Sequence, residues 1–164
     1  MSNTGEDTES AAPVDPGYIQ SEDWETVVRS VPIVSVDLVV LTDDGVVLTK
    51  RTNEPAKDEW FVPGGRVRKG ERIRDAVHRV ADEELGVDVT IEQSLDAYEH
   101  LYETSELDDT GGKHYVPHGF VVRADSESFT LDTQHEAVEV FPEPQRTSTN
   151  TWLIIFGMRA SAHS

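Results

Sequence analysis

The chain has 164 residues and a formal net charge of −18 at pH 7, from 32 Asp and Glu against 14 Lys and Arg. This length suits one domain with a single core, and the charge argues against nucleic acid or an anionic membrane as a partner. There is no cysteine, which excludes disulfides and thiol chemistry. No segment approaches the ~20 apolar residues of a membrane span. The first residues lack an apolar signal segment, so we expect a soluble, cytoplasmic protein.

The excess of acidic residues is interpreted as a solvated surface rather than as a binding feature. So much Asp and Glu with so little Lys resembles proteins of salt-loving organisms, in which salt screens the self-repulsion. An anionic substrate is still compatible with this composition, provided that cations gather locally.

The chain is expected to begin with a disordered acidic tail over residues 1–16, followed by one folded domain over residues 17–164. Ser21 is expected to cap a short helix that Pro32 ends. Trp24 lies on this helix and has two interpretations: packing beneath the helix, or stacking on a nucleotide base.

A β-branched run predicts a buried strand over residues 33–41. Asp37 interrupts it, and a lone Asp in such a run is usually an edge residue or one that binds the backbone. The turn at residues 43–45 and the apolar run at 46–50 predict a hairpin. Arg51 ends the hairpin and, taken alone, is a solvated charge.

Residues 64–87 combine a glycine bend with an amphipathic helix. The glycines at 64 and 65 are expected to form a loop that lets the main chain approach a ligand closely. The helix is expected to start near Gly70, with Glu71 in its first turn, and to end at Gly86. Its buried stripe is formed by Ile73, Ala76, Val77 and Val80.

Glu84 lies near the middle of that apolar stripe, four residues after Val80. A buried carboxylate must be paired or must bind a metal, because an isolated buried charge is very costly. For Glu84 we favour a hard cation held by oxygen ligands, with Mg²⁺ first, over a side chain that bends out to water. For Glu83 alone we favour a surface ion pair with Arg79.

Further strands are expected where apolar residues alternate with polar ones, at residues 87–91, 98–102, 114–122 and 138–141. The acidic stretch 103–112 is expected to be a mobile loop near the mouth of a site. Residues 151–160 are apolar enough for a final helix. Among the six histidines, the positions with some promise for an active site are His100, His114, His118 and His135.

Residues 65–87 resemble the Nudix box, the signature of Nudix hydrolases. The matching positions are Gly65, Glu71, Arg79, Ala81, Glu83, Glu84, Gly86 and Val87, and so many fixed positions make a specific signal. Val80 departs from the pattern, because most Nudix hydrolases have a metal-binding Glu there; fewer metal ions are therefore expected. GDP-mannose mannosyl hydrolases also carry an apolar residue at this position, and the similarity to that subfamily extends over roughly residues 18–135.

The resemblance implies a Nudix α/β/α sandwich, with a mixed β-sheet between helices, and by analogy a homodimer. Periodicity alone supports only a mixture of α and β. The resemblance also implies Mg²⁺-dependent hydrolysis of a nucleotide sugar, GDP-mannose or GDP-glucose. Water would attack the anomeric carbon and release GDP and an inverted sugar.

The same resemblance assigns the metal ligands and the general base. Mg²⁺ would be held by the Gly64 carbonyl, Glu84 and Gln134, with Glu83 in support through water or an Arg contact. His135 is expected to be the general base, and imidazole suits that role because its ordinary pKa is near working pH.

The substrate contacts follow from the resemblance as well. Arg66 and Arg51 would neutralise the departing diphosphate, Tyr115 would donate a hydrogen bond, and Asp37 would lie near the sugar. The other substrate-binding residues are expected to be Tyr18, Ile19, Trp24 and His100. Packing is an equal alternative for Trp24 and the favoured one for Ile19.

Two other functions stay open. The first is a Nudix hydrolase that cleaves the P–O bond of another nucleoside diphosphate derivative. The second is a module that has lost catalysis and only binds nucleotide sugars. Val80 makes such a loss conceivable, whereas Glu84, Arg66 and His135 argue against it.

Overall fold

A computed structural model describes residues 18–52, 57–131 and 135–142. The expected tail, the final helix expected at 151–160 and Gln134 lie outside these residues. The elements are α1 (Ser21–Ser30), β1 (Ile33–Thr42), β2 (Gly45–Arg51), β3 (Trp60–Phe61), β4 (Gly64–Arg66), α2 (Ile73–Leu85), β5 (Val89–Ala97), β6 (His100–Tyr102), β7 (Lys113–Ala124) and β8 (His135–Phe141).

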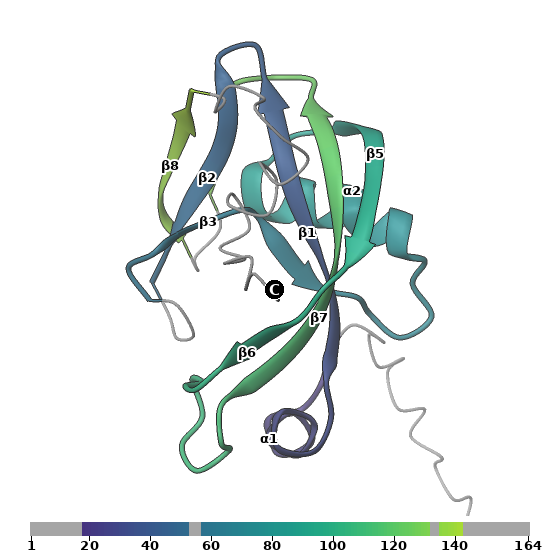
Figure 1. Ribbon diagram of the computed structural model, residues 1–164, viewed down its shortest axis with the longest axis vertical. Helices are drawn as coiled ribbons and strands as arrows, with labels where there is room; N and C mark the ends of the chain where they lie inside the picture. Colours follow the sequence, from purple (N-terminus) through teal and green to yellow (C-terminus); the bar gives the residue numbers. More distant parts are fainter. Residues whose placement is uncertain (1–17, 53–56, 132–134, 143–164) are drawn as a thin grey trace, which may run out of the picture.

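The eight described strands form one mixed sheet (Figure 1). Its main path runs β3-β2-β1-β7-β5, while β4 pairs with β1, β6 with β7 and β8 with β2. β1 and β7 are parallel neighbours, from Ile33 opposite Tyr115 to Leu41 opposite Arg123. The other pairs of described strands are antiparallel. A parallel pair needs a long crossover, and here the crossover contains α2. The expected mixed sheet is confirmed.

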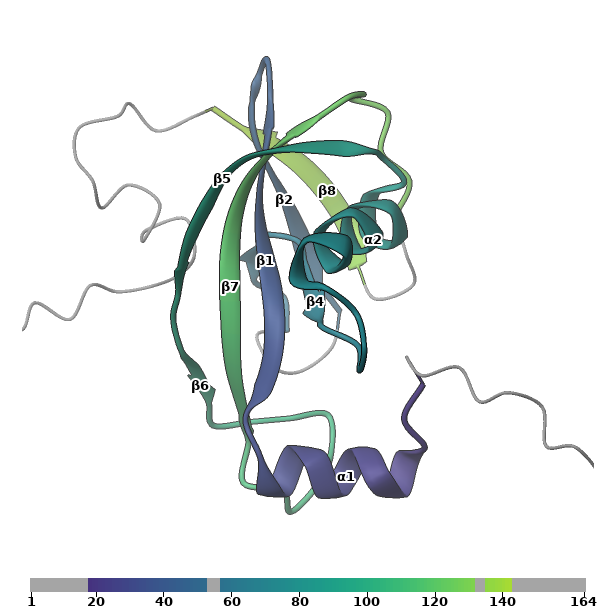
Figure 2. The same cartoon turned by 90° about the vertical axis from the view of Figure 1, so that its right-hand side faces the viewer.

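The core lies on both faces of β1, because its side chains alternate between the two faces. Val36, Leu38 and Val40 are fully buried against α2, whereas Val39 and Leu41 belong to a second cluster. Figure 2 shows α2 against one face of the sheet and α1 across the lower end of β1 and β7.

β1 changes its partner along one edge, and this change positions the later site. Residues 40–42 pair with β2, but residues 35–37 pair with β4. Between them, the Leu38 amide donates to the Pro63 carbonyl at 2.8 Å. The edge partner of β1 therefore changes from β2 to β4 close to Asp37.

α2 starts later than expected. It begins at Ile73 with Arg72 as its N-cap, so Glu71 lies before the helix rather than in its first turn. Ile73 is 37% exposed, and its expected burial was wrong because the first helical residue extends past the sheet. Gly86 ends the helix at φ 65°, a left-handed conformation that glycine adopts without strain, as expected.

α1 is present and ends before Pro32, as expected, but its cap differs. Gln20 is the N-cap and makes no side-chain cap hydrogen bond, while Ser21 is already helical. Capping by Ser21 was therefore wrong. Among the described residues, no helix is both long and apolar enough to cross a membrane.

The expected glycine loop is the short strand β4. Gly64 lies opposite Asp37 and Gly65 opposite Val36. A Cβ on Gly64 would meet Asp37 Oδ1 at 2.4 Å, and one on Gly65 would meet Val80 Cγ2 at 2.9 Å. Glycine is required at positions 64 and 65 because protein side chains come close to the strand from both faces. The sequence analysis explained these two glycines only by the approach of a ligand.

We predict that Gly65→Ala lowers the free energy of unfolding by about 1–3 kcal/mol, because a β-branched Val80 has little freedom to move away. Val80→Ala removes the contact, so the double variant should lose less stability than the sum of the two single losses. Denaturant unfolding of the four proteins measures this coupling. Strictly additive losses would show that Val80 is not the reason for glycine at position 65.

Candidate active site

Arg79 of α2 holds the segment that enters the helix. Its Nε and Nη2 donate to the two carboxylate oxygens of Glu71 at 2.7 and 2.8 Å, and Nη2 also donates to the Arg66 carbonyl at 2.8 Å. The Arg68 amide donates to Glu71 Oε1 at 3.0 Å. This bidentate pair is geometrically specific, and it fixes the end of β4 against the helix.

The pair also determines the protonation of both groups. The hydrogen bond from Arg79 lowers the pKa of Glu71 below its ordinary value of 4.5, although burial opposes that shift. The same hydrogen bond raises the pKa of Arg79. Both groups are therefore charged at neutral pH.

Glu83 makes the surface ion pair expected for it. Its Oε1 accepts from Arg68 and its Oε2 from Arg79, each at 3.0 Å, and its side chain is 46% exposed. Both carboxylate oxygens thus already face guanidinium groups. A supporting role for Glu83 at a metal stays a prediction.

Glu84 is half-buried and turns toward β4. Its Oε2 accepts a hydrogen bond from the Gly64 amide at 3.2 Å. Val80 instead packs against Gly65, at the position where the family pattern has a further carboxylate. Within the described ranges, no group of three or more His, Cys, Asp or Glu could hold a metal ion.

Arg66 lies on the same face of the sheet as Asp37, because it is opposite Ser35 in the register of β4 with β1. Burial lowers the pKa of its guanidinium, and the charges of Arg68 and Arg79 lower it further. Glu71 and Glu83 pair with Arg68 and Arg79, so the three arginines leave a small excess of positive charge at the end of β4 in a strongly acidic chain. Such a place favours an anionic group of a ligand.

Asp37 is buried in the middle of β1 and is paired with strands on both sides, so it is not an edge residue, and its contacts among the described residues include two side chains. The Tyr98 hydroxyl donates to its Oδ2, and His100 Nε2 lies 3.5 Å from the same oxygen. The side chains of Asp37 and His100 are only 12% and 13% exposed. An acidic group is therefore held within the sheet, next to Gly64.

Aromatic rings surround His100 on this face. Ring centroids lie 5.1 Å away for Tyr98, 5.6 Å for Tyr102 and 5.8 Å for Phe61. Burial raises the pKa of Tyr98 and of Tyr102, and the charge of Asp37 raises both further. The two phenols therefore keep their protons, so each is available as a hydrogen-bond donor.

Trp24 of α1 is held by charged groups. Its Nε1 donates to Glu106 Oε1 at 3.0 Å, and the Lys113 ammonium lies 5.1 Å and the Arg66 guanidinium 5.9 Å from the ring centroid. Lys113 is 6% exposed and pairs with Glu106 at 2.5 Å. Glu106 thus ties the 103–112 loop, which was expected to be mobile, to α1 and β7.

The other expected residues are distributed as follows. His100 lies opposite Tyr115, and His135 lies opposite Arg51. Ile19 is half-buried. Tyr18 is 64% exposed, and its nucleotide contact stays a prediction, as does that of Ile19.

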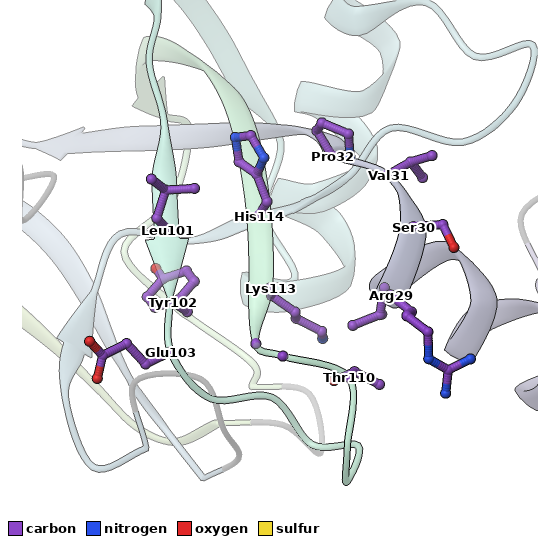
Figure 3. A pocket seen from close by; sticks show the side chains of 13 residues that line it. Arg29, Ser30, Val31, Pro32, Leu101, Tyr102, Glu103, Thr110, Lys113 and His114 are labelled. Carbon is purple, nitrogen blue, oxygen red and sulfur yellow. The ribbon is translucent and has the colours of Figure 1, made fainter.

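The side chains of His114 and His118 lie on the other face of the sheet from that of Asp37, because His118 is opposite Val36 in the register of β7 with β1. His118 shares a hydrogen bond of 2.8 Å with Ser94 and stacks on Phe120. His114 lines a pocket of about 510 Å³ between α1, β6 and β7, together with Lys113 (Figure 3). The lining of this pocket does not include Gly64 or Glu84, so it is distinct from the place where these two residues meet.

Sequence reasoning missed Tyr98, Glu106 and Lys113. Tyr98, His100 and Tyr102 alternate along an extended segment, a period of two that would have placed them on one face. Glu106 and Lys113 gave no such signal, because their pairing depends on how the loop folds back.

We predict that Glu71→Gln lowers the free energy of unfolding at neutral pH by about 1–3 kcal/mol, the usual range for a hydrogen bond to a charged group. Because the pKa of Glu71 is lowered in the folded state, its stabilisation is present above pH 4.5 and is lost as the pH falls below that value. The difference between wild type and variant should therefore shrink in acid. Denaturant unfolding across pH measures this difference.

Glu25→Gln is the matched control, since it breaks an exposed pair with Arg29 one helical turn away and should cost no more than about 0.5 kcal/mol. Equal losses for the two variants would contradict the role given to Glu71.

Known proteins resemble this chain in sequence and in fold. The chain matches the NUDIX domain over residues 31–152. It is 52% identical over 126 residues to the low-salt glycan biosynthesis protein Agl8 of Haloferax volcanii, covering 77% of this chain and 81% of that protein. It is 37% identical over 67 residues to the ADP-ribose pyrophosphatase of Methanocaldococcus jannaschii, covering 41% of this chain and 40% of that protein.

A solved structure of similar fold is the MutT NUDIX hydrolase from Burkholderia pseudomallei. It superposes with a TM-score of 0.56 at 27% identity, over 76% of this chain and 95% of that chain. The expected α/β fold with a mixed sheet and helices is thereby confirmed. The chain belongs to the NUDIX domain family.

Proposed function

We propose that the chain hydrolyses a GDP-sugar, GDP-mannose or GDP-glucose, to GDP and free sugar, with water attacking the anomeric carbon. The observation that carries this proposal is the contrast between two positions of α2. Glu84 reaches the main chain of Gly64, whereas Val80 packs on Gly65. One carboxylate from α2 at β4, rather than two, suits stabilisation of a leaving group better than metal activation of the attacking water.

Mg²⁺ fits the donor atoms of this site. The Glu84 carboxylate lies at the main chain of Gly64, and carboxylate and carbonyl oxygens are the ligands that hard cations prefer. We propose Glu84, the Gly64 carbonyl and Gln134 as ligands, with Glu83 in support. Bound there, Mg²⁺ would neutralise charge on the diphosphate.

The residues around Gly64 support separate contacts to diphosphate and sugar. Arg66 lies in the cationic group beside Gly64 and, with Arg51, would neutralise the departing GDP. On the same face, Asp37 and His100 approach each other, and Tyr115 lies opposite His100 in the register. We propose that Asp37 and His100 bind near the sugar and that Tyr115 donates a hydrogen bond to the departing diphosphate.

His135 is the proposed general base. It begins β8 opposite Arg51, which brings its backbone to the strand end that carries the proposed diphosphate contact. A histidine there would take a proton from the attacking water, because its ordinary pKa lies near neutral pH.

The relatives favour a role with nucleotide sugars. The Haloferax volcanii protein is named for glycan biosynthesis, and glycan assembly consumes activated sugars. We propose that this chain acts on such a sugar in the cytoplasm, as a homodimer. Trp24, Tyr18 and Ile19 would lie on the nucleotide side.

We predict that turnover of GDP-mannose or GDP-glucose with Mg²⁺, in water enriched in heavy oxygen, puts the label into the free sugar and not into GDP. Mass spectrometry of both products measures this, at low and high salt because the chain is so acidic. A substrate panel that includes ADP-ribose tests for the pyrophosphatase activity after which the Methanocaldococcus jannaschii relative is named. Label in a phosphate product would establish P–O cleavage and contradict the proposal, and absence of turnover would favour a binding module.

A further inference from the structure

Asp37 is enclosed from three directions by different elements. The Tyr98 hydroxyl, after β5, donates to Oδ2, and His100 Nε2 of β6 lies 3.5 Å from that oxygen. On the other side, Oδ1 lies where a Cβ on Gly64 would be, at 2.4 Å. The carboxylate therefore fills the space left by the missing side chain of Gly64.

A carboxylate buried this deeply needs hydrogen-bond donors, because its desolvation is costly. Tyr98 supplies a direct hydrogen bond, whereas His100 Nε2 is buried at a distance too long for one and makes no hydrogen bond in the described structure. Burial raises the pKa of Tyr98, so its hydroxyl stays protonated and can only lose this role by moving. Tyr98 is therefore the group that determines where Oδ2 lies.

We propose that Tyr98 is a positioning residue for the reaction: its hydroxyl holds the Asp37 carboxylate between Gly64 and His100, in the orientation that meets the sugar. The inference rests on the proposed function for the role of Asp37. Packing alone is the competing explanation, because the Tyr98 ring also packs on the cluster around Val39.

The geometry separates these two explanations. Tyr98→Phe keeps the ring and its contacts but removes the hydroxyl, so packing is preserved while Oδ2 loses its donor. Without that donor, the carboxylate is free to rotate toward His100. Tyr98→Phe should then change the contacts to the sugar end of the substrate and the surroundings of His100. It should leave unchanged the contacts to the nucleotide end near Arg66.

The expected result is that Tyr98→Phe lowers kcat for the GDP-sugar by about 10- to 100-fold, the usual scale for misplacement of a catalytic group. The affinity for GDP, measured by calorimetry, should stay within about 3-fold because the nucleotide contacts are untouched. Tyr102→Phe is the matched control. Its ring stacks on His100 at 5.6 Å, and we expect its kcat to fall much less.

A measurement without substrate makes the inference independent of the proposed function. A crystal structure of Tyr98→Phe without substrate should show the Asp37 carboxylate turned away from its wild-type orientation between Gly64 and His100, since Oδ2 has lost its donor. Tyr102 stacks on the His100 ring, Tyr115 lies opposite His100 in the register, and the charges of Arg51 and Glu59 act on Tyr102. All four are unchanged in the variant.

The outcomes distinguish the two claims. A reoriented Asp37 carboxylate in Tyr98→Phe, in a protein that turns over no nucleotide sugar, would contradict the proposed function but support the link from Tyr98 to Asp37. An Asp37 carboxylate in its wild-type orientation together with wild-type kcat would overturn the inference, and so would equal effects of Tyr98→Phe and Tyr102→Phe.

Discussion

Gly64 lies between two carboxylates, and the geometry of the site depends on that arrangement. Glu84 takes the hydrogen bond of its amide from the helix side, and Asp37 lies against its Cα from the sheet side. A larger residue would displace Asp37, and a β4 that did not pair with β1 would lose both contacts. The short strand therefore couples the proposed metal end of the site to the proposed sugar end.

The surrounding charges keep β4 in this position. Arg79 binds Glu71, Glu83 and the Arg66 carbonyl, so the strand, the following turn and α2 are held by one guanidinium. The same network commits the oxygens of Glu83 to arginines and leaves Glu84 as the carboxylate turned toward Gly64. Arg66 then adds positive charge on the face of the sheet that carries Asp37. In so acidic a chain, this local concentration of cations is what would let an anionic substrate bind.

Much of this could be predicted from the sequence, because local patterns specify it. The β-branched run of β1, the hairpin turn and Gly86 each follow from short-range rules, and the box pattern points to Glu84. The start of α2 and the burial of Ile73 could not be predicted, since they depend on where the helix leaves the sheet. Tyr98 joins Asp37 across 61 residues, and no local rule reports a contact set by strand register. The reason for Gly64 likewise became visible only with Asp37 opposite it.

The most direct test of the central claim is Mg²⁺ binding in the presence of GDP, measured by calorimetry on Glu84→Gln and Glu83→Gln. Both substitutions remove one charge from neighbouring positions of α2. If the Glu84 carboxylate holds the cation, Glu84→Gln should weaken Mg²⁺ binding by at least about 10-fold, and Glu83→Gln should weaken it much less. Unchanged Mg²⁺ affinity in Glu84→Gln, or a larger loss in Glu83→Gln, would contradict the account.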